Sequence, residues 1–260
     1  MVQFSGHGRR CRHRRLERYR AAIARRLAAR GDRCVLLARN EERLRKTAEE
    51  LGAEYKVCDV ADRSAVERIA AAVLERHPRI DLLVNNAGMP ARRGFLAADP
   101  DRIEDVIRVN YLGSVWCLRA FLPGLDAAAP SDVVNIVSVA GTVAFPPSGP
   151  YSASKHAQLA FSRAVAAELR PRGIRVHAVL PGFVETEGFP QRDLLRMPVF
   201  GRLVVGPDQV ARHVVRVVER GRPGETHVPR WYRVGTLSQA VLPRIVHSVV
   251  SRAGYGKNRG

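Results

Sequence analysis

The chain has 260 residues, of which 46% are hydrophobic, enough to bury one sizeable core in a single domain. Its formal charge is +18, but only four of its 43 basic residues are lysine, so arginine-rich coding accounts for the charge better than a nucleic-acid-binding patch. The four cysteines are widely spaced, and no apolar run approaches the roughly 20 residues of a membrane span. We therefore expect a reduced, cytoplasmic protein with no metal site and no nucleic-acid partner.

Residues 1–20 form an arginine-rich head with seven arginines and one acidic residue, Glu17. No apolar stretch follows Arg9 and Arg10, so the head fits neither a secretory signal nor a twin-arginine signal. A basic arm and a mitochondrial presequence remain alternatives.

Helix and strand patterns alternate through the first half of the chain. Short, nearly all-apolar runs predict strands buried on both faces, and the amphipathic runs between them predict helices. A helix from residue 21 should end at Gly31, and Asn40 should cap a second helix that ends at Gly52. A capping box at 64–67 should open a third helix that runs to about His77. The expected strands are 33–38, 55–60 and 80–84.

The second half continues the alternation. A long helix should follow Pro100 and end near Pro123, and another should run from about Ser148 to Pro171. A further helix should follow Pro207. Residues 183–206 read as an irregular apolar segment, and 235–252 as an amphipathic tail interrupted by proline. The expected strands are 133–138, 174–180 and 225–228.

This alternation predicts an α/β fold, a doubly wound Rossmann-type parallel sheet in one domain over residues 21–260. One element is missing. The helix that begins near residue 21 should be preceded by a strand and a glycine turn, and the arginine-rich head stands in that place.

Tyr151 and Lys155 stand four residues apart in "YSASK" and share one face of the expected helix. A free tyrosine has a pKa of about 10. A neighbouring ammonium favours the phenolate, which would make Tyr151 a usable acid and base near neutral pH. Taken alone, the motif also fits an ordinary surface pair.

Further short motifs lie at or near the expected strand ends. "NNAG" (85–88) follows one strand, "NIVSVAG" (135–141) ends another with Ser138, and "PG" (181–182) follows a third, while Asn110 lies in a helix. Over roughly residues 20–230 this order resembles the short-chain dehydrogenase/reductase family. The resemblance implies a Rossmann-type domain of about seven strands and hydride transfer between NAD(P) and an alcohol or carbonyl carbon.

The resemblance also implies a role for each matching residue. Tyr151 would be the proton donor and acceptor, and Lys155 would lower its pKa and bind the nicotinamide ribose. Ser138 would bind the reacting oxygen, and Asn110 would support a proton relay through water. The implied cofactor contacts are, besides Tyr151 and Lys155, Asp59, Val60, Asn86, Ala87, Gly88, Pro181, Gly182, Val184 and Thr186.

Cofactor choice rests on the end of the second expected strand. An NAD-binding enzyme usually places a carboxylate there for the ribose hydroxyls. This chain has Ala38 followed by Arg39, whose guanidinium suits a phosphate. We therefore expect the cofactor to be NADP(H), with NAD(H) as the alternative. Arg39 could instead be an ordinary solvated arginine with no role in binding.

Two apolar segments, 141–150 and 189–205, should flank the site. A pocket lined by them favours a lipophilic alcohol or carbonyl substrate; the alternative is a lid that packs on its own core or on a subunit partner. The tail carries Leu237, Val241, Ile245 and Val249 at steps of four. It favours a homo-oligomer contact or a core helix over contact with a membrane surface.

The head itself has a specific explanation. Cys11–Arg20 can be encoded so that a shift of one base reads V-V-T-G-A-S-S-G-I-G, which is a strand end followed by the family's T-G-x-x-x-G-x-G loop. The head is then a frameshift product that displaces the first strand and the glycine loop. One alternative is that the head is a true basic arm. For the function, the alternatives are a pseudoenzyme that keeps the catalytic residues but cannot hold the cofactor, and a binding protein whose basic head contacts nucleic acid.

Overall fold

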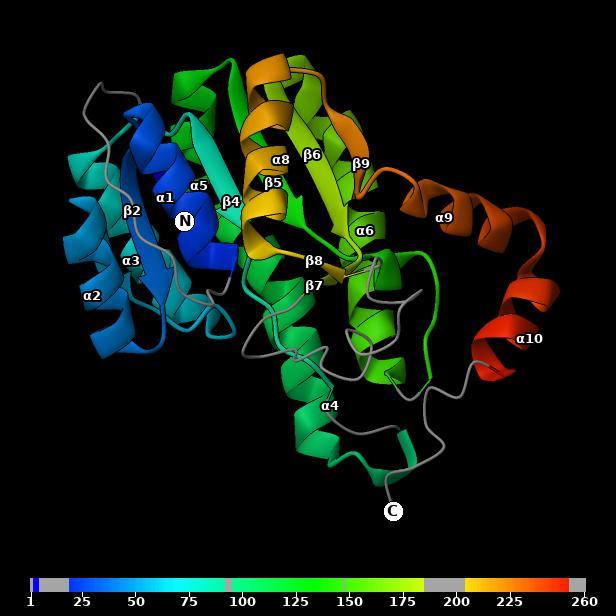
Figure 1. The fold of residues 1–260 in the computed structure, drawn as a ribbon. Coiled ribbons are helices and arrows are strands. Elements are labelled where there is room, and N and C mark those ends of the chain that lie inside the picture. The colour runs from blue at the N-terminus through cyan, green and yellow to red at the C-terminus, as the bar shows by residue number, and fades with distance from the viewer. Residues whose placement is uncertain (1, 5–18, 92–94, 147, 185–203, 253–260) are drawn as a thin grey trace.

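The computed structural model describes residues 2–4, 19–91, 95–146, 148–184 and 204–252, with side chains from 21 to 248 within those ranges. They form a seven-stranded sheet (Figure 1) in the order β3-β2-β1-β4-β5-β6-β9. Every neighbouring pair is parallel except the two that involve β1. The doubly wound Rossmann-type fold is therefore confirmed. The strands are β1 (Val2–Phe4), β2 (Arg33–Ala38), β3 (Glu54–Val57), β4 (Leu82–Asn85), β5 (Ser131–Ile136), β6 (Ile174–Pro181) and β9 (Gly224–Val228).

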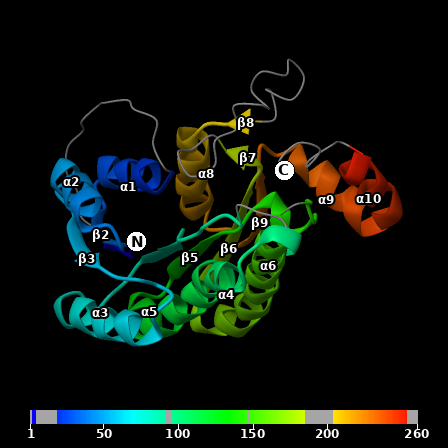
Figure 2. The ribbon, with the colours of Figure 1, turned by 90° about the horizontal axis from the view of Figure 1, so that it is seen from below.

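Helices cover both faces of the sheet (Figure 2). One buried cluster joins the sheet to α1 (Tyr19–Arg30), α2 (Glu41–Leu51) and α8 (Pro207–Arg220). A second cluster, on the opposite face, joins it to α3 (Arg63–Arg76), α5 (Gly113–Ala128) and α6 (Gly149–Leu169).

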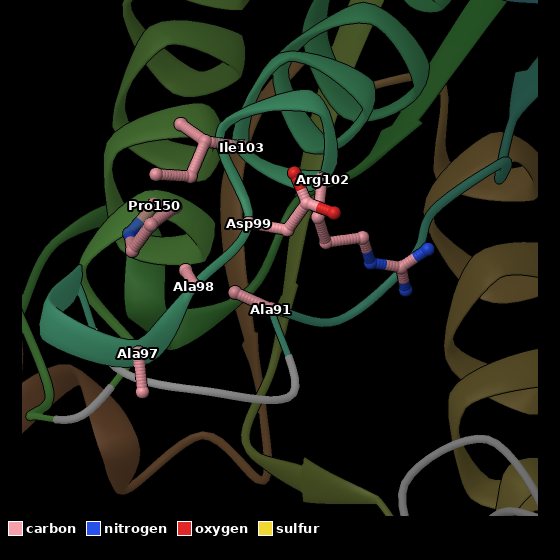
Figure 3. A pocket seen from close by; sticks show the side chains of 7 residues that line it. All are labelled: Ala91, Ala97, Ala98, Asp99, Arg102, Ile103 and Pro150. Carbon is pink, nitrogen blue, oxygen red and sulfur yellow. The ribbon is translucent and has the colours of Figure 1, made fainter.

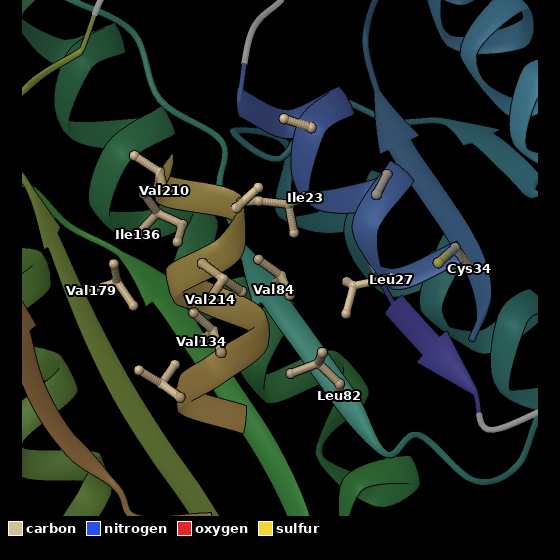
Figure 4. Packing of buried hydrophobic residues seen from close by; sticks show 14 of the residues in the cluster. Ile23, Leu27, Cys34, Leu82, Val84, Val134, Ile136, Val179, Val210 and Val214 are labelled. Carbon is tan, nitrogen blue, oxygen red and sulfur yellow. The ribbon is translucent and has the colours of Figure 1, made fainter. Parts of the chain in front are cut away.

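The first cluster holds α1 in place through side chains that follow the arginine-rich head. Ile23 and Leu27 of α1 lie beside Val210 and Val214 of α8, over Val84 of β4 (Figure 4). All five side chains are at most 2% exposed. Each such side chain contributes about 1.5–3 kcal/mol of burial free energy, so the helix docks through residues downstream of the arginine block.

The central slot of the sheet is filled in an unexpected way. The sequence predicts that the first strand is missing, and the structure places β1 between β2 and β4, antiparallel to both. Phe4 pairs with Arg33, the first residue of β2, so β1 ends at the amino edge of the parallel strands. A vacant slot would leave the facing backbone groups of two strands unpaired, and this short segment satisfies part of them.

Two predicted helix boundaries are wrong. The helix after Pro100 does not end near Pro123: α4 (Pro100–Ile107) is followed by a π-helical turn at Arg108–Leu112, and α5 then continues to Ala128 with Pro123 inside it. Burial of α5 residues on both sides of the proline outweighs the lost backbone hydrogen bond.

The start of α3 also differs from the prediction. Asp62, and not Ser64, caps the helix by accepting a hydrogen bond from the Ala65 backbone N–H at 3.0 Å. The α2 caps are confirmed, because Asn40 accepts from the Arg43 N–H and Gly52 has a left-handed φ of 61°.

The described part of the chain ends in two short helices that lead away from the sheet (Figure 1), α9 (Tyr232–Val241) and α10 (Pro243–Arg252). Leu237, Val241 and Ile245 are 53%, 73% and 57% exposed, so the prediction of a core helix here is wrong. No helix in the described part of the chain is long and apolar enough to cross a membrane.

Candidate active site

The predicted site residues gather at the carboxyl edge of the parallel strands. Arg39 follows β2, Asp59 and Val60 follow β3, and Asn86–Gly88 follow β4. Ser138 follows β5, and Gly182 comes directly after β6. Ligands of open parallel sheets bind at this edge. Of the predicted residues, Thr186 falls outside the described ranges.

Lys155 lies in α6 and is only 3% exposed. Its Nζ donates hydrogen bonds to the Ile136 carbonyl at 3.0 Å and to Gln158 Oε1 at 2.7 Å. Because a buried ammonium is costly unless it is hydrogen-bonded, these two acceptors fix its position directly behind the end of β5.

Tyr151 stands one helical turn before Lys155 and is half-buried. Ser138 begins the short helix η3 (Val139–Gly141), where its Oγ accepts from the Ala140 N–H at 3.1 Å. A Cβ on Gly141 would stand 2.8 Å from the Lys155 carbonyl oxygen. Glycine thus lets the segment after Ser138 approach the helix that carries Tyr151 and Lys155.

Asn110 is fully buried in the π-helical turn between α4 and α5. Its Oδ1 accepts from the Met89 N–H at 2.8 Å, and its Nδ2 donates to the Met89 carbonyl at 3.1 Å and to Ser154 Oγ at 2.9 Å. A Cβ on Gly88 would lie 3.5 Å from Asn110 Oδ1 and 3.8 Å from Lys155 Nζ. The turn therefore ties the "NNAG" segment to α6, and π-helical turns of this kind are frequent at functional sites.

A buried polar network lies behind Lys155 and was not predicted from the sequence. Gln158 accepts from Lys155 and donates to Ser114 Oγ at 2.8 Å. Asn85 donates to Asn135 Oδ1 at 2.9 Å, and Asn135 donates to Ser162 Oγ at 2.8 Å. Ser162 in turn donates to the Gln158 carbonyl.

One member of this network had a readable signal in the sequence. Gln158 follows Lys155 by three residues, so the two share a helix face. The asparagine pair had none, because Asn85 and Asn135 meet only when two strands 50 residues apart lie side by side in the sheet.

The cofactor side of the edge carries a loose ion pair. Arg39 Nη1 lies 3.4 Å from Asp59 Oδ2, and the two side chains are 61% and 39% exposed. Arg39 is therefore accessible to a ligand. Val60 packs against the start of α5, where a Cβ on Gly113 would come within 2.8 Å of its Cγ2.

Asn86 offers a test of whether the edge suits a polar cofactor. Its Oδ1 is buried and has no hydrogen-bond partner among the residues that the structure describes. An unpaired buried acceptor costs about 1–3 kcal/mol, and a ligand donor would remove that cost. The residues present therefore fit a dinucleotide cofactor. Arg39 would lie at its adenosine ribose, Lys155 at its nicotinamide ribose, and Asn86 would accept a hydrogen bond from it.

Helix α9 packs against the carboxyl edge of the sheet at Gly182, directly after β6. A Cβ on Gly182 would stand 2.3 Å from the Tyr232 ring, so Tyr232 lies directly against Gly182. The Phe183 ring lies between those of Phe145 and Tyr232, with centroids 6.0 and 6.5 Å away.

Two threonines add a polar contact between α9 and the sheet. Thr236 Oγ1 lies 3.1 Å from Thr142 Oγ1 and 2.9 Å from His227 Nε2. Burial lowers the pKa of His227.

A cavity of about 400 Å³ opens at the start of α6 (Figure 3). Pro150, the residue before Tyr151, forms part of its wall. The predicted flanking segment 189–205 lies outside the described residues except at 204–205. The remaining lining residues are Ala91, Ala97, Ala98, Asp99, Arg102 and Ile103.

The chain is similar to known dehydrogenases and reductases over most of its length. The granaticin polyketide synthase putative ketoacyl reductase 1 of Streptomyces violaceoruber is 37% identical over 212 residues, covering 79% of this chain and 77% of that protein. The 2-(R)-hydroxypropyl-CoM dehydrogenase of Xanthobacter autotrophicus is 40% identical over 174 residues, covering 64% of this chain and 70% of that protein.

Solved structures of such enzymes have the same fold. An alcohol dehydrogenase from the archaeon Thermococcus sibiricus, complexed with 5-hydroxy-NADP, matches with a TM-score of 0.70 and 29% identity over 79% of this chain and 89% of that one. An actinorhodin polyketide ketoreductase with NADPH matches with a TM-score of 0.69 and 33% identity over 77% and 85%.

The short chain dehydrogenase family model matches residues 21–193, and the match begins where the arginine-rich head ends. With the sheet order, the carboxyl-edge site and these relatives, this match shows that the chain belongs to the short-chain dehydrogenase/reductase family of oxidoreductases.

Proposed function

We propose that this protein reduces the carbonyl group of a lipophilic substrate with NADPH, or oxidises the corresponding alcohol with NADP, and that Tyr151 is its acid and base. The observation that carries the proposal is the pairing in α6: a buried, hydrogen-bonded Lys155 lies one helical turn from half-buried Tyr151.

A bound nicotinamide cofactor supplies or accepts the hydride. Tyr151 donates its phenolic proton to the carbonyl oxygen during reduction and takes it back during oxidation. The ammonium of Lys155 favours the phenolate form of Tyr151, and the Ser138 hydroxyl donates a hydrogen bond to the same substrate oxygen.

Asn110 is a positioning residue and does not contact the substrate. Its side chain is committed to Met89 and Ser154, so it fixes the segment after β4 against α6. We infer that the backbone of the π-helical turn supports the water through which the proton of Tyr151 is replaced.

NADP(H) is favoured over NAD(H) because Arg39 is accessible and because β2 ends in Ala38, where an NAD-binding enzyme usually has a carboxylate. The similarity to structures solved with NADP and NADPH supports this choice. Asp59, Val60 and Asn86–Gly88 would contact the adenosine half, and Pro181, Gly182, Val184 and Thr186 the nicotinamide half.

The lipophilic substrate class is supported by a group of aromatic side chains at this edge. The Phe183 ring contacts those of Phe145 and Tyr232, and Tyr232 lies against Gly182. Relatives named as ketoacyl reductases add a chemical class, a ketone on an acyl chain, to this expectation.

We infer further that residues 1–20 are not part of the functional domain and replace a glycine loop through a shift of reading frame. Two observations support this: the family match begins at residue 21, and β1 runs in the reverse direction in the central slot. A chain with this head would hold the cofactor diphosphate poorly, because that site is made by backbone N–H groups at a helix N-terminus.

The test compares the chain as written with a repaired chain in which Cys11–Arg20 is replaced by VVTGASSGIG. NADPH absorbance is followed with a panel of medium- and long-chain ketones, and NADPH affinity is measured by fluorescence. Repair should tighten NADPH binding by about 100-fold, as expected for two charge-assisted hydrogen bonds of roughly 1.5 kcal/mol each.

Each outcome bears on one of the proposals. Turnover by the repaired chain supports the oxidoreductase function, and tight binding without turnover of any ketone or alcohol would contradict it. Equal NADPH affinity in both chains would show that the head does not stand in place of a glycine loop. Sequencing the 5′ end of the gene provides an independent check of the reading frame.

A further inference from the structure

The C-terminal arm, residues 230–252, is amphipathic in the opposite sense to the other surface helices. In α8, the buried positions are Val210, Ala211, Val214 and Val217. In α9, Tyr232 and Thr236 face the body of the protein, whereas Val234, Leu237 and Val241 are 66%, 53% and 73% exposed, and Trp231 just before the helix is 48% exposed. The arm therefore turns its apolar side to the outside.

The apolar side continues through the junction into α10. Leu242 and Ile245 are 49% and 57% exposed. Figure 2 shows α9 and α10 extending beyond the layers that cover the sheet. The described part of the chain thus leaves a large apolar surface exposed on two consecutive helices, and surfaces of this kind mark interaction sites.

The other exposed large hydrophobic side chains lie toward the same edge of the sheet. Val57 is the last residue of β3, and Phe95 and Leu96 lie in η1 (Phe95–Ala97), which follows the carboxyl end of β4. The arm follows the carboxyl end of β9. Exposed large apolar side chains therefore belong to the edge that carries Ser138, Tyr151 and Gly182.

The charge of the arm indicates what covers it. The arm contains no aspartate or glutamate in its sequence, and it carries four arginines. Arg230, Arg233 and Arg244 are exposed. A second copy of the arm would bring arginines against arginines, so the charge opposes self-association and favours an anionic partner.

We propose that the C-terminal arm lies on a membrane surface that contains anionic lipids, with its apolar side at the boundary between headgroups and acyl chains and its arginines among the lipid phosphates. Basic helices with aromatic and aliphatic residues on one face bind in this way. Because Tyr232 of the arm lies against Gly182, the contact holds the substrate edge close to the lipid.

Delivery of a lipophilic substrate from the bilayer rests on the proposed function, whereas the membrane contact itself does not. The test therefore measures binding without turnover. Trp231 is one of two tryptophans, so a Trp116→Phe background makes it the only indole. Its fluorescence is recorded while vesicles of phosphatidylcholine with phosphatidylglycerol, or of phosphatidylcholine alone, are added.

We expect a blue shift with the anionic vesicles and little change with the neutral ones. Two variants then separate the contributions. Reversal of three charges (Arg230→Glu, Arg233→Glu and Arg244→Glu) should weaken binding by roughly 100-fold or more, from the usual contribution of one arginine near an anionic surface. The triple variant Val234→Ser, Leu237→Ser and Val241→Ser keeps every charge and should weaken binding at least tenfold.

A matched control reverses three exposed charges on α2 (Arg43→Glu, Arg45→Glu and Lys46→Glu), and its binding should stay within twofold of the parent. All variants keep the arginine-rich head. If the arm variants bind as tightly as the parent, or if neutral vesicles bind equally well, the proposal is wrong. It is also wrong if light scattering shows a dimer that dissociates on the serine substitutions, because the arm then covers a second copy.

Discussion

The two sides of β4 differ in how their sites are made. Toward β5 and β6 the strands are parallel and in register, and side chains from four segments form a buried network behind Lys155. Toward β2 the central slot holds a three-residue strand that runs the other way, and the segment before α1 lies outside the described residues. The proposed catalytic side is built from side chains, whereas a dinucleotide loop is built from backbone N–H groups.

Because of this difference, the site on the β5 side of β4 can form even where the glycine loop on the β2 side is absent. The core that holds α1 consists of residues after position 21, so the packing of α1 relies on side chains downstream of the arginine-rich head. A phosphate loop has no such redundancy, since its function lies in one short stretch of N–H groups. Proton chemistry and cofactor affinity should therefore respond to separate substitutions.

Tyr151→Phe, made in the repaired chain, should separate them most clearly. Removal of the phenolic hydroxyl should lower kcat by roughly 100- to 10,000-fold, the usual contribution of general acid–base catalysis, and leave NADPH affinity within a few-fold. Stopped-flow turnover and fluorescence titration measure the two quantities. Activity close to that of the parent would remove Tyr151 from the mechanism.

Arg39→Ala addresses the cofactor side alone. Loss of one charge-assisted hydrogen bond should weaken NADPH binding by at least about tenfold and change NADH binding little, because only NADPH carries the phosphate. The matched control is Arg43→Ala, another exposed arginine close by. Equal losses for both cofactors would contradict the assignment of NADP(H).

Gln158 tests the network behind Lys155 as a positioning residue. Gln158→Met keeps the length of the side chain but removes the acceptor for Lys155 Nζ, so we expect kcat to fall several-fold and the free energy of unfolding to drop by about 1–3 kcal/mol. Gln158→Glu keeps an acceptor and should restore most of kcat. A purely structural role predicts that both variants lose stability while kcat is unchanged.

The smallest expected effect is on the pH dependence of stability, and it concerns His213 of α8. Burial and the nearby arginines lower the pKa of His213 to about 4, from 6.5 in the unfolded chain. The unfolded state binds the proton more readily, so stability should fall as the pH is lowered from about 6.5 towards 4. Urea unfolding at pH 7 and pH 5 measures this loss, and His213→Leu should reduce it. An identical loss in parent and His213→Leu proteins would assign the pH dependence to other groups.

The sequence by itself determined most of the fold and the elements that carry the site. Local signals were sufficient where one segment decides its own structure. The apolar run 33–38 is β2, Asn40 and Gly52 bound α2, and the spacing of Tyr151 and Lys155 puts both on one face of α6. The carboxyl-edge placement of Ser138 and Gly182 followed from strand order, because parallel strands end at the same edge.

Tertiary structure decided what depends on partners distant in the sequence. Asn110 is held by Met89 and Ser154, and the pairing of Asn85 with Asn135 requires two adjacent strands. Likewise, the periodicity of the tail fits a core helix and an exposed one equally well. Only the packing of Tyr232 against Gly182 fixed which side of α9 faces inward, since periodicity defines a face but not its neighbour.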